Sequence, residues 1–181
     1  DPPAYATANL FFTSDFVDMS ATSMPNWHGW QHNRTVYKIQ DGLILVMDNA
    51  TSDKTSQPAS LIWHLTGNGE TIKNEMNLNN GRRAASMVWT ESDTPFISRQ
   101  AVPTNNTYLR SPEWELLYTS ESNDVLRTSV AFLTQEYTKG DFDLAYIGEN
   151  RAGILANWSF EESETQLLHN FNGKYVETDN L

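Results

Sequence analysis

The sequence contains no cysteine among its 181 residues. Disulfide bonds, thiolate zinc sites and cysteine nucleophiles are therefore excluded. A chain of this length buries enough apolar surface to fold without such crosslinks. Secreted eukaryotic domains of this size usually carry cysteines, so their absence favours a bacterial source.

Long apolar runs are also missing. No segment approaches the roughly 20 consecutive apolar residues of a membrane-spanning helix. No signal peptide is present, and the chain opens on Asp1-Pro2-Pro3. We expect no membrane partner, and we expect this start to belong to a fragment or a processed form of a larger protein.

Positive charge is scarce, with 12 Lys and Arg against 23 Asp and Glu, for a net charge of −11. A nucleic acid needs a positive face on its protein partner, so we expect no nucleic-acid partner. Adsorption to anionic membranes is opposed for the same reason. The average surface also repels a polyanionic glycan, although a local basic patch can still receive one.

Several catalytic motifs are absent as well. The sequence has no glycine-rich phosphate loop, no Gly-x-Ser-x-Gly elbow and no His-Glu-x-x-His helix. The carboxylate pair Glu161-Glu162 lies in a turn-like context and is typical of solvated charge. A glycosidase needs two carboxylates across a cleft, which spacing on strands does not establish. We expect no cofactor and no chemistry from this chain alone.

Strand signals dominate what is present. Short runs of β-branched and aromatic residues are separated by Asn, Asp, Gly, Ser and Pro at roughly 8–12 residue intervals. No segment of helical length keeps a 3.6-residue period. We predict an all-β fold, a large antiparallel β-sandwich of stacked sheets with about 12–14 strands, as a single domain over residues 1–181. The predicted strands are Ala8–Thr13, Asn33–Gln40, Leu43–Asn49, Ala59–Leu65, Glu70–Asn74, Ala84–Trp89, Pro95–Arg99, Tyr108–Arg110, Glu113–Thr119, Val125–Leu133, Asp141–Ile147, Gly153–Phe160, Thr165–Asn170 and Lys174–Glu177.

The clearest hairpin joins the second and third of these strands through Asp41-Gly42, which supplies the positive φ of a tight turn. The run Leu43–Met47 is apolar on both faces, as in strands that are covered on each side, and it predicts stacked sheets. Two other segments are predicted to lie outside strands: Asp15–Met19 as a single helical turn and Asn77–Gly81 as a loop.

An aromatic and basic segment precedes the first arm of that hairpin. It reads Trp27-His28-Gly29-Trp30-Gln31-His32-Asn33-Arg34. In a binding interpretation, Trp27 and Trp30 stack on sugar rings while His32 and Arg34 bond hydroxyls or carboxylates. In a structural interpretation, Trp30 and Arg34 pack under a loop and Arg34 meets a buried acid. The residues leave both interpretations open.

Asp48 is the natural partner of Arg34. A three-residue turn over Gln40–Gly42 places the two residues opposite each other on one face, whereas a two-residue turn shifts the pairing by one. We expect a structural ion pair. His32, Asp48 and His64 also form a candidate metal set, whose ligand types suit zinc. The alternative for His64, in the apolar run Leu61–Leu65, is a hydrogen-bonded core histidine.

Three runs together resemble the C-terminal sheet region of heparinase II/III-type polysaccharide lyases. They are Trp30–Tyr37, Gly42–Asp48 and Leu61–Leu65. In that family a His-x-Arg-Thr strand precedes a hydrophobic strand that ends in Asp, and a strand similar to Trp-His-Leu follows. The resemblance covers Ala8–Leu65, and the remaining chain is similar only in having more strands of a sandwich.

The resemblance implies a secreted or periplasmic enzyme with an N-terminal α/α toroid and C-terminal stacked sheets. Such enzymes cleave uronic-acid-containing glycans by β-elimination, in which a base removes the proton α to the carboxylate and neutralising groups stabilise the enolate. The family's catalytic Asn, His and Tyr lie largely on the toroid. Its sheet-borne His-x-His-Asn-Asp-like stretch and metal-binding Asp have no match here, because His28 and His32 are spaced differently. No catalytic residue or zinc ligand is therefore carried over, and Arg34, Asp48 and His64 match structural positions.

Three hypotheses about function follow. The first is a non-catalytic sandwich domain of such a lyase, which supports the toroid and lines part of the substrate cleft. The second is a carbohydrate-binding module with Trp27, Trp30, His32 and Arg34 as its platform. The third is a structural or adhesion sandwich that binds a protein partner in an extracellular assembly.

Overall fold

The computed structural model describes residues 6–39, 42–53, 58–65, 68–72, 75–79, 87–92, 96–100, 114–120, 124–133, 142–148, 152–160 and 163–171. The chain divides into two compact units, residues 1–134 and 135–181, and each is described by itself. The described residues form strands and turns. No helix long and apolar enough to cross a membrane occurs among them.

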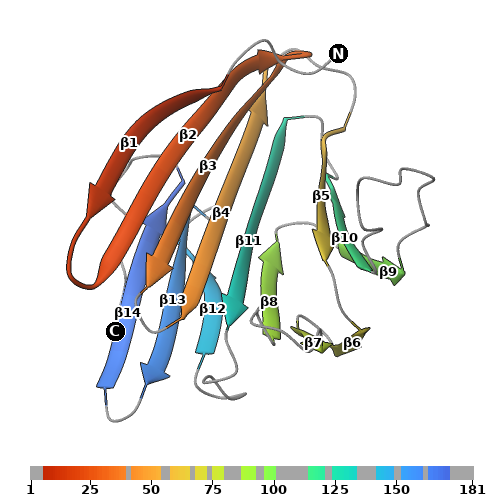
Figure 1. The fold of residues 1–181 in the computed structure, drawn as a ribbon. Coiled ribbons are helices and arrows are strands. Elements are labelled where there is room, and N and C mark those ends of the chain that lie inside the picture. The colour runs from red at the N-terminus through yellow and green to blue at the C-terminus, as the bar shows by residue number, and fades with distance from the viewer. Residues whose placement is uncertain are drawn as a thin grey trace, which may run out of the picture. The chain divides into compact units, whose positions relative to one another are not determined.

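An eight-stranded antiparallel sheet forms most of the first unit (Figure 1). Its order is β1-β2-β3-β4-β11-β8-β7-β6, so four strands form a meander and β11 returns to lie beside β4. The strands are β1 Thr7–Thr13, β2 Val17–Trp27, β3 Trp30–Ile39, β4 Leu43–Ser52, β6 Asn68–Ile72, β7 Glu75–Asn79, β8 Met87–Ser92 and β11 Val125–Leu133.

A smaller antiparallel sheet packs against the large one. Its order is β5-β10-β9, with β5 Ser60–Leu65, β9 Phe96–Gln100 and β10 Trp114–Thr119. Side chains from both sheets form one buried cluster: Trp30, Ala50, Leu126 and Val130 from the large sheet, and Leu65, Leu116 and Tyr118 from the small sheet. This shared core makes the two sheets a sandwich and confirms the predicted all-β fold.

The apolar run of β4 lies in the middle of the large sheet, between β3 and β11. Leu43, Leu45 and Met47 are at most 1% exposed. Val46, on the opposite face, is 4% exposed, while Ile44 on that face is 39% exposed. Apart from Ile44, this strand is covered on both faces, as its apolar run predicted.

The second unit is a three-stranded antiparallel meander of β12 Phe142–Ile147, β13 Gly153–Phe160 and β14 Ser163–Asn170. Apolar side chains face each other across β12 and β13, where Phe142 is opposite Trp158 and Leu144 is opposite Ala156. All four are buried. The alternation of apolar and polar residues along β12 thus gives this sheet one apolar face.

The prediction of a helical turn at Asp15–Met19 is wrong. Strand β2 begins at Val17, and Met19 pairs with Tyr37 of β3. The Ser14 hydroxyl accepts hydrogen bonds from the N–H groups of Phe16 and Val17, at 3.3 and 3.1 Å. This serine turn closes a hairpin between β1 and β2, and a hairpin outweighs the weak helical preference of so short a segment.

The loop predicted at Asn77–Gly81 is also wrong, because its first three residues belong to β7. Strand β7 pairs with β6 on one side and β8 on the other. Pairing on both sides outweighs the low strand preference of asparagine. The predicted strands Tyr108–Arg110 and Lys174–Glu177 lie outside the described residues.

Candidate functional site

The register of β3 against β4 brings Arg34 directly opposite Asp48. Strand β3 ends at Ile39 and β4 begins at Leu43, which leaves three residues between the arms. This is the three-residue turn for which Arg34 and Asp48 were predicted to lie opposite each other. Because the side-chain period of a strand is 2, His32 lies on the same face as Arg34.

The Asp48 carboxylate is held by two basic side chains of β3. Arg34 donates from Nε to Oδ1 at 2.7 Å and from a terminal nitrogen to Oδ2 at 3.1 Å. The Nε2 atom of His32 lies 2.6 Å from the same Oδ1. The Asp48 side chain is only 3% exposed, against 32% for Arg34 and 23% for His32. The buried charge is therefore matched by a bidentate guanidinium pair, the strongest geometry available to a carboxylate.

The Arg34 guanidinium also stacks on the smaller sheet. Its central carbon lies 4.7 Å from the ring centroid of Trp63 on β5, within the range of a cation–π contact. The Trp63 ring meets Phe132 of β11 edge to face at 5.3 Å between centroids. Arg34 therefore links the two sheets, in addition to pairing with Asp48.

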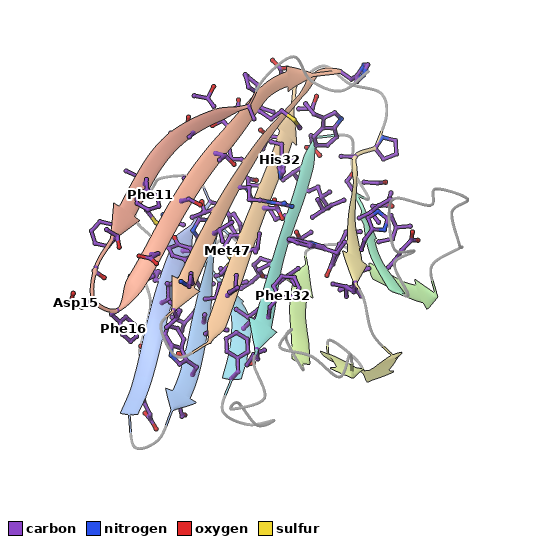
Figure 2. All side chains as sticks on the ribbon, in the orientation of Figure 1. Phe11, Asp15, Phe16, His32, Met47 and Phe132 are labelled. Carbon is purple, nitrogen blue, oxygen red and sulfur yellow. The ribbon has the colours of Figure 1, made fainter. Side chains whose placement is uncertain are left out.

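A cleft of about 610 Å³ opens beside this cluster. His32 lies on its wall, toward the end of β3 that follows the β2–β3 turn (Figure 2). The lining side chains come from β2, β3, β4, β5 and β11, from the β2–β3 turn and from the segment before β5. They are Met24, His28, Trp30, His32, Arg34, Asp48, Ala50, Pro58, Ala59, Ser60, Leu61, Ile62 and Leu126.

The ionisable side chains of this cleft are mostly those of basic residues, although the chain as a whole is acidic. His28, His32 and Arg34 line it, and Asp48 supplies the one carboxylate among the described lining residues. Asp48 accepts two of the five N–H groups that a guanidinium carries. The remaining wall is largely apolar, with Met24 among its residues. Such a lining suits a ligand that combines anionic oxygen atoms with the apolar faces of sugar rings.

The turn between β2 and β3 places His28 at the cleft. His28 and Gly29 have φ angles of 51° and 87°, and Trp27 pairs with Trp30 on either side of them. Two positive φ angles in a two-residue hairpin define a type I′ turn, whose twist matches that of the strands. The Ser52 hydroxyl donates to the Gly29 carbonyl at 2.6 Å and fixes the turn against β4.

The two tryptophans of the predicted platform lie at either end of the β2–β3 turn. Trp30 is 8% exposed and belongs to the core shared by the two sheets, so little of its ring face is open to a sugar. Trp27 ends β2, and its side chain lies outside the described residues. Of the four platform residues, His32 and Arg34 therefore offer the clearest polar groups to the cleft.

The three candidate metal ligands do not come together. His32 and Asp48 are in contact, but the His64 side chain is 56% exposed and lies on the face of β5 opposite to Trp63. His64 Nδ1 instead lies 3.5 Å from a carboxylate oxygen of Glu115 on β10. No group of three His, Asp or Glu suited to a metal ion occurs in the part of the chain that the structure describes.

Sequence reasoning missed several residues of the cleft. His28 was part of the aromatic and basic segment, and His28-Gly29 between two tryptophans was an available signal for a tight hairpin. The other missed side chains, Met24 and Leu126, come from separate strands whose pairing no local pattern reveals.

Comparisons with known proteins find the same fold in polysaccharide lyases. A heparinase III gene product aligns with a TM-score of 0.64 and 9% identity over 91% of this chain and 27% of its own. The heparan sulfate lyase HepC from Pedobacter heparinus aligns with a TM-score of 0.62 and 13% identity over 94% of this chain and 28% of its own. No protein-family model and no curated protein sequence matches.

The likeness confirms the resemblance to heparinase II/III-type lyases at the level of the fold. It extends over 91–94% of the chain, whereas the sequence resemblance covered only Ala8–Leu65. The chain spans about 27–28% of the length of these solved structures. It therefore has the architecture of one domain of these larger proteins.

Proposed function

We propose that this chain is the sheet domain of a heparinase II/III-like polysaccharide lyase, and that catalytic residues outside it perform the β-elimination. The fold match over 91–94% of the chain, at TM-scores of 0.62–0.65, carries this proposal. In the whole enzyme, this domain supports an N-terminal α/α toroid and forms one wall of the substrate cleft. The substrate of the whole enzyme is an acidic glycan, which the enzyme of a bacterium meets outside the cytoplasm.

The cleft of His28, His32 and Arg34 is the part of this wall that contacts the glycan. β-Elimination next to a uronate needs groups that neutralise the carboxylate while the α proton leaves. Basic side chains in a partly apolar cleft supply hydrogen bonds to a carboxylate or sulfate that are stronger than those between neutral groups. Asp48 holds Arg34 and His32 in place, so these donors are oriented before the ligand arrives.

Turnover by the purified chain is the first test. We expect no release of unsaturated uronate from heparan sulfate or other uronate-containing glycans, measured by the ultraviolet absorbance of that product. A heparinase III assayed in parallel is the positive control. Turnover by the 181-residue chain at a rate above the glycan blank would contradict the non-catalytic role.

Binding to the cleft is tested by titration calorimetry with acidic oligosaccharides. We expect His28→Asn and His32→Gln each to weaken binding about tenfold, because a hydrogen bond to a charged group contributes roughly 1.5–3 kcal/mol. Glutamine keeps a donor toward Asp48, so His32→Gln leaves that contact possible. His64→Gln is the matched control, since it removes an exposed imidazole that does not line the cleft. Equal losses in all three variants would contradict a site in this cleft.

A free-standing carbohydrate-binding module is the alternative that the apolar part of the cleft favours. Neutral oligosaccharides of the same length distinguish the two functions in the same titration. Selective binding of the acidic sugars supports the lyase domain. Equal binding of neutral and acidic sugars supports the module.

A further inference from the structure

The described charges of the cleft cancel when its histidines are uncharged. Arg34 of β3 contributes one positive charge and Asp48 of β4 contributes one negative charge. The other ionisable lining residues are His28 of the β2–β3 turn and His32 of β3. The described lining residues from β2, β5 and β11 do not titrate; they are Met24, Ser60, Leu61, Ile62 and Leu126. A net positive charge in this cleft therefore requires a protonated imidazole.

The contact with Asp48 determines which nitrogen of His32 carries a hydrogen. His32 Nε2 lies 2.6 Å from Asp48 Oδ1. The Asp48 carboxylate also accepts from the Arg34 guanidinium through both of its oxygens. An ionised carboxylate can only accept hydrogen bonds, so Nε2 is the donor. In the uncharged ring the other nitrogen, Nδ1, then carries a lone pair and no hydrogen.

The Nδ1 atom of His32 has no protein partner of its own. Within the described part of the chain, Asp48 is the only hydrogen-bond partner of His32, and the contact uses Nε2. The bonds to hydrogen at the two ring nitrogens diverge, so Nδ1 points away from Asp48. The His32 side chain is 23% exposed and lines the cleft. A lone pair at Nδ1 repels an anionic oxygen, whereas a protonated Nδ1 donates a charge-assisted hydrogen bond to it.

We propose that binding of an anionic sugar group in this cleft is coupled to the uptake of one proton from solvent at His32 Nδ1. The coupling rests on the proposed function, because it needs the acidic glycan to bind here. In the complex, the imidazolium donates from Nε2 to Asp48 and from Nδ1 to the anion. Such linkage is reciprocal: protonation of His32 strengthens anion binding by the same factor by which the anion strengthens protonation.

Titration calorimetry with a heparan sulfate tetrasaccharide tests the coupling. Repeating the titration near neutral pH in buffers of different ionisation enthalpy gives the number of protons taken up. Carboxyl groups titrate near pH 4 and sulfate esters stay charged, so the sugar itself takes up no proton. We expect uptake of roughly half a proton or more per bound sugar, since histidine ordinarily changes charge between about pH 5 and 8. The affinity should fall as the pH rises, by at most about tenfold per pH unit for one proton.

Single substitutions identify the histidine that takes up the proton. The amide of His32→Gln can still donate to Asp48 but cannot be protonated, so we expect this variant to lose most of the uptake and of the pH dependence. His28→Asn should keep the uptake even though it weakens binding. His64→Gln is the matched control, because it removes an exposed imidazole that does not line the cleft. A merely structural role of His32 would change the affinity without changing the number of protons.

Ring-nitrogen NMR shifts of the four histidines give the same answer in the unsubstituted chain. We expect His32 to be an uncharged ring with hydrogen on Nε2 before the sugar is added and an imidazolium afterwards. Binding of the acidic sugar without proton uptake would overturn the coupling and leave the proposed function standing. Uptake that persists in His32→Gln would do the same. Absence of binding at every pH would count against the proposed function and, with it, against the coupling.

Discussion

Asp48 is the residue on which the polar contacts inside the first unit converge. Its carboxylate is almost fully buried and contacts Arg34 and His32 within 3.1 Å. Burial of a carboxylate is tolerated because its partners replace the lost water, and the same partners form the basic side of the cleft. Support of the fold and shaping of the candidate site thus depend on one side chain.

Replacement of Arg34 tests this dependence. We expect Arg34→Met to lower the free energy of unfolding by about 3 kcal/mol, because it leaves a buried charge without its bidentate partner. Urea denaturation measures the change. Lys38→Met is the control: Lys38 lies 3.9 Å from Asp18, and the side chains are 68% and 42% exposed. Such a pair contributes less than about 1 kcal/mol, so similar losses in both variants would contradict the assigned role of Arg34.

His169, in the second unit, gives the protein a pH-dependent stability. Burial lowers the pKa of His169 from 6.5 to about 4, and its ring packs edge to face on Phe171 at 4.8 Å. The unfolded chain therefore binds a proton near pH 6.5, whereas the folded chain does so only near pH 4. Stability is complete above pH 6.5 and falls as the pH drops toward 4, by at most about 1.4 kcal/mol per pH unit.

His169→Gln removes this contribution. We expect a smaller decline of the urea midpoint between pH 6.5 and 4 in this variant than in the wild-type chain. His64→Gln, which replaces an exposed histidine, should retain the wild-type decline. Parallel pH profiles for wild type and His169→Gln would show that burial of His169 is not the cause.

At the scale of elements, two hairpins build the candidate site. The β3–β4 hairpin pairs Arg34 with Asp48, and the β2–β3 turn places His28 on the cleft. The first was predicted because Asp41-Gly42 lies between two clear strand patterns. The second was missed because β2 combines small and polar residues with Pro25, and its register shifts between Met24 and Trp27. Proline is accommodated in strands at such irregularities.

Gly29 tests the β2–β3 turn. We expect Gly29→Ala to destabilise the protein by about 1–2 kcal/mol, because alanine resists the φ of 87° that this position requires. His28→Asn should leave stability unchanged or raise it slightly, since asparagine is favoured at positive φ in type I′ turns. Thermal unfolding compares the two variants, and an unaffected Gly29→Ala protein would argue against this turn type.

At the scale of the whole molecule, the fold was more predictable than the site. Strand spacing and the two-faced apolar run of β4 were sufficient for an antiparallel sandwich, and β11 and β13 have the predicted bounds. The cleft was not predictable, because its lining comes from strands distant in sequence, such as those of His32, Ile62 and Leu126. Whether such side chains meet depends on which face each strand buries, and a one-residue change of register reverses that face.

The three-residue spacing between β3 and β4 therefore limits which insertions and deletions the chain tolerates. A two-residue turn at Asp41-Gly42 would instead pair Gln40 with Leu43 and bring Arg34 opposite Asn49, so that the guanidinium and the Asp48 carboxylate would no longer share a face. Surface turns usually accept length changes freely. Among variants of this protein we expect changes in the turn only where Ile39 still pairs with Leu43, because that register directs the guanidinium toward its carboxylate.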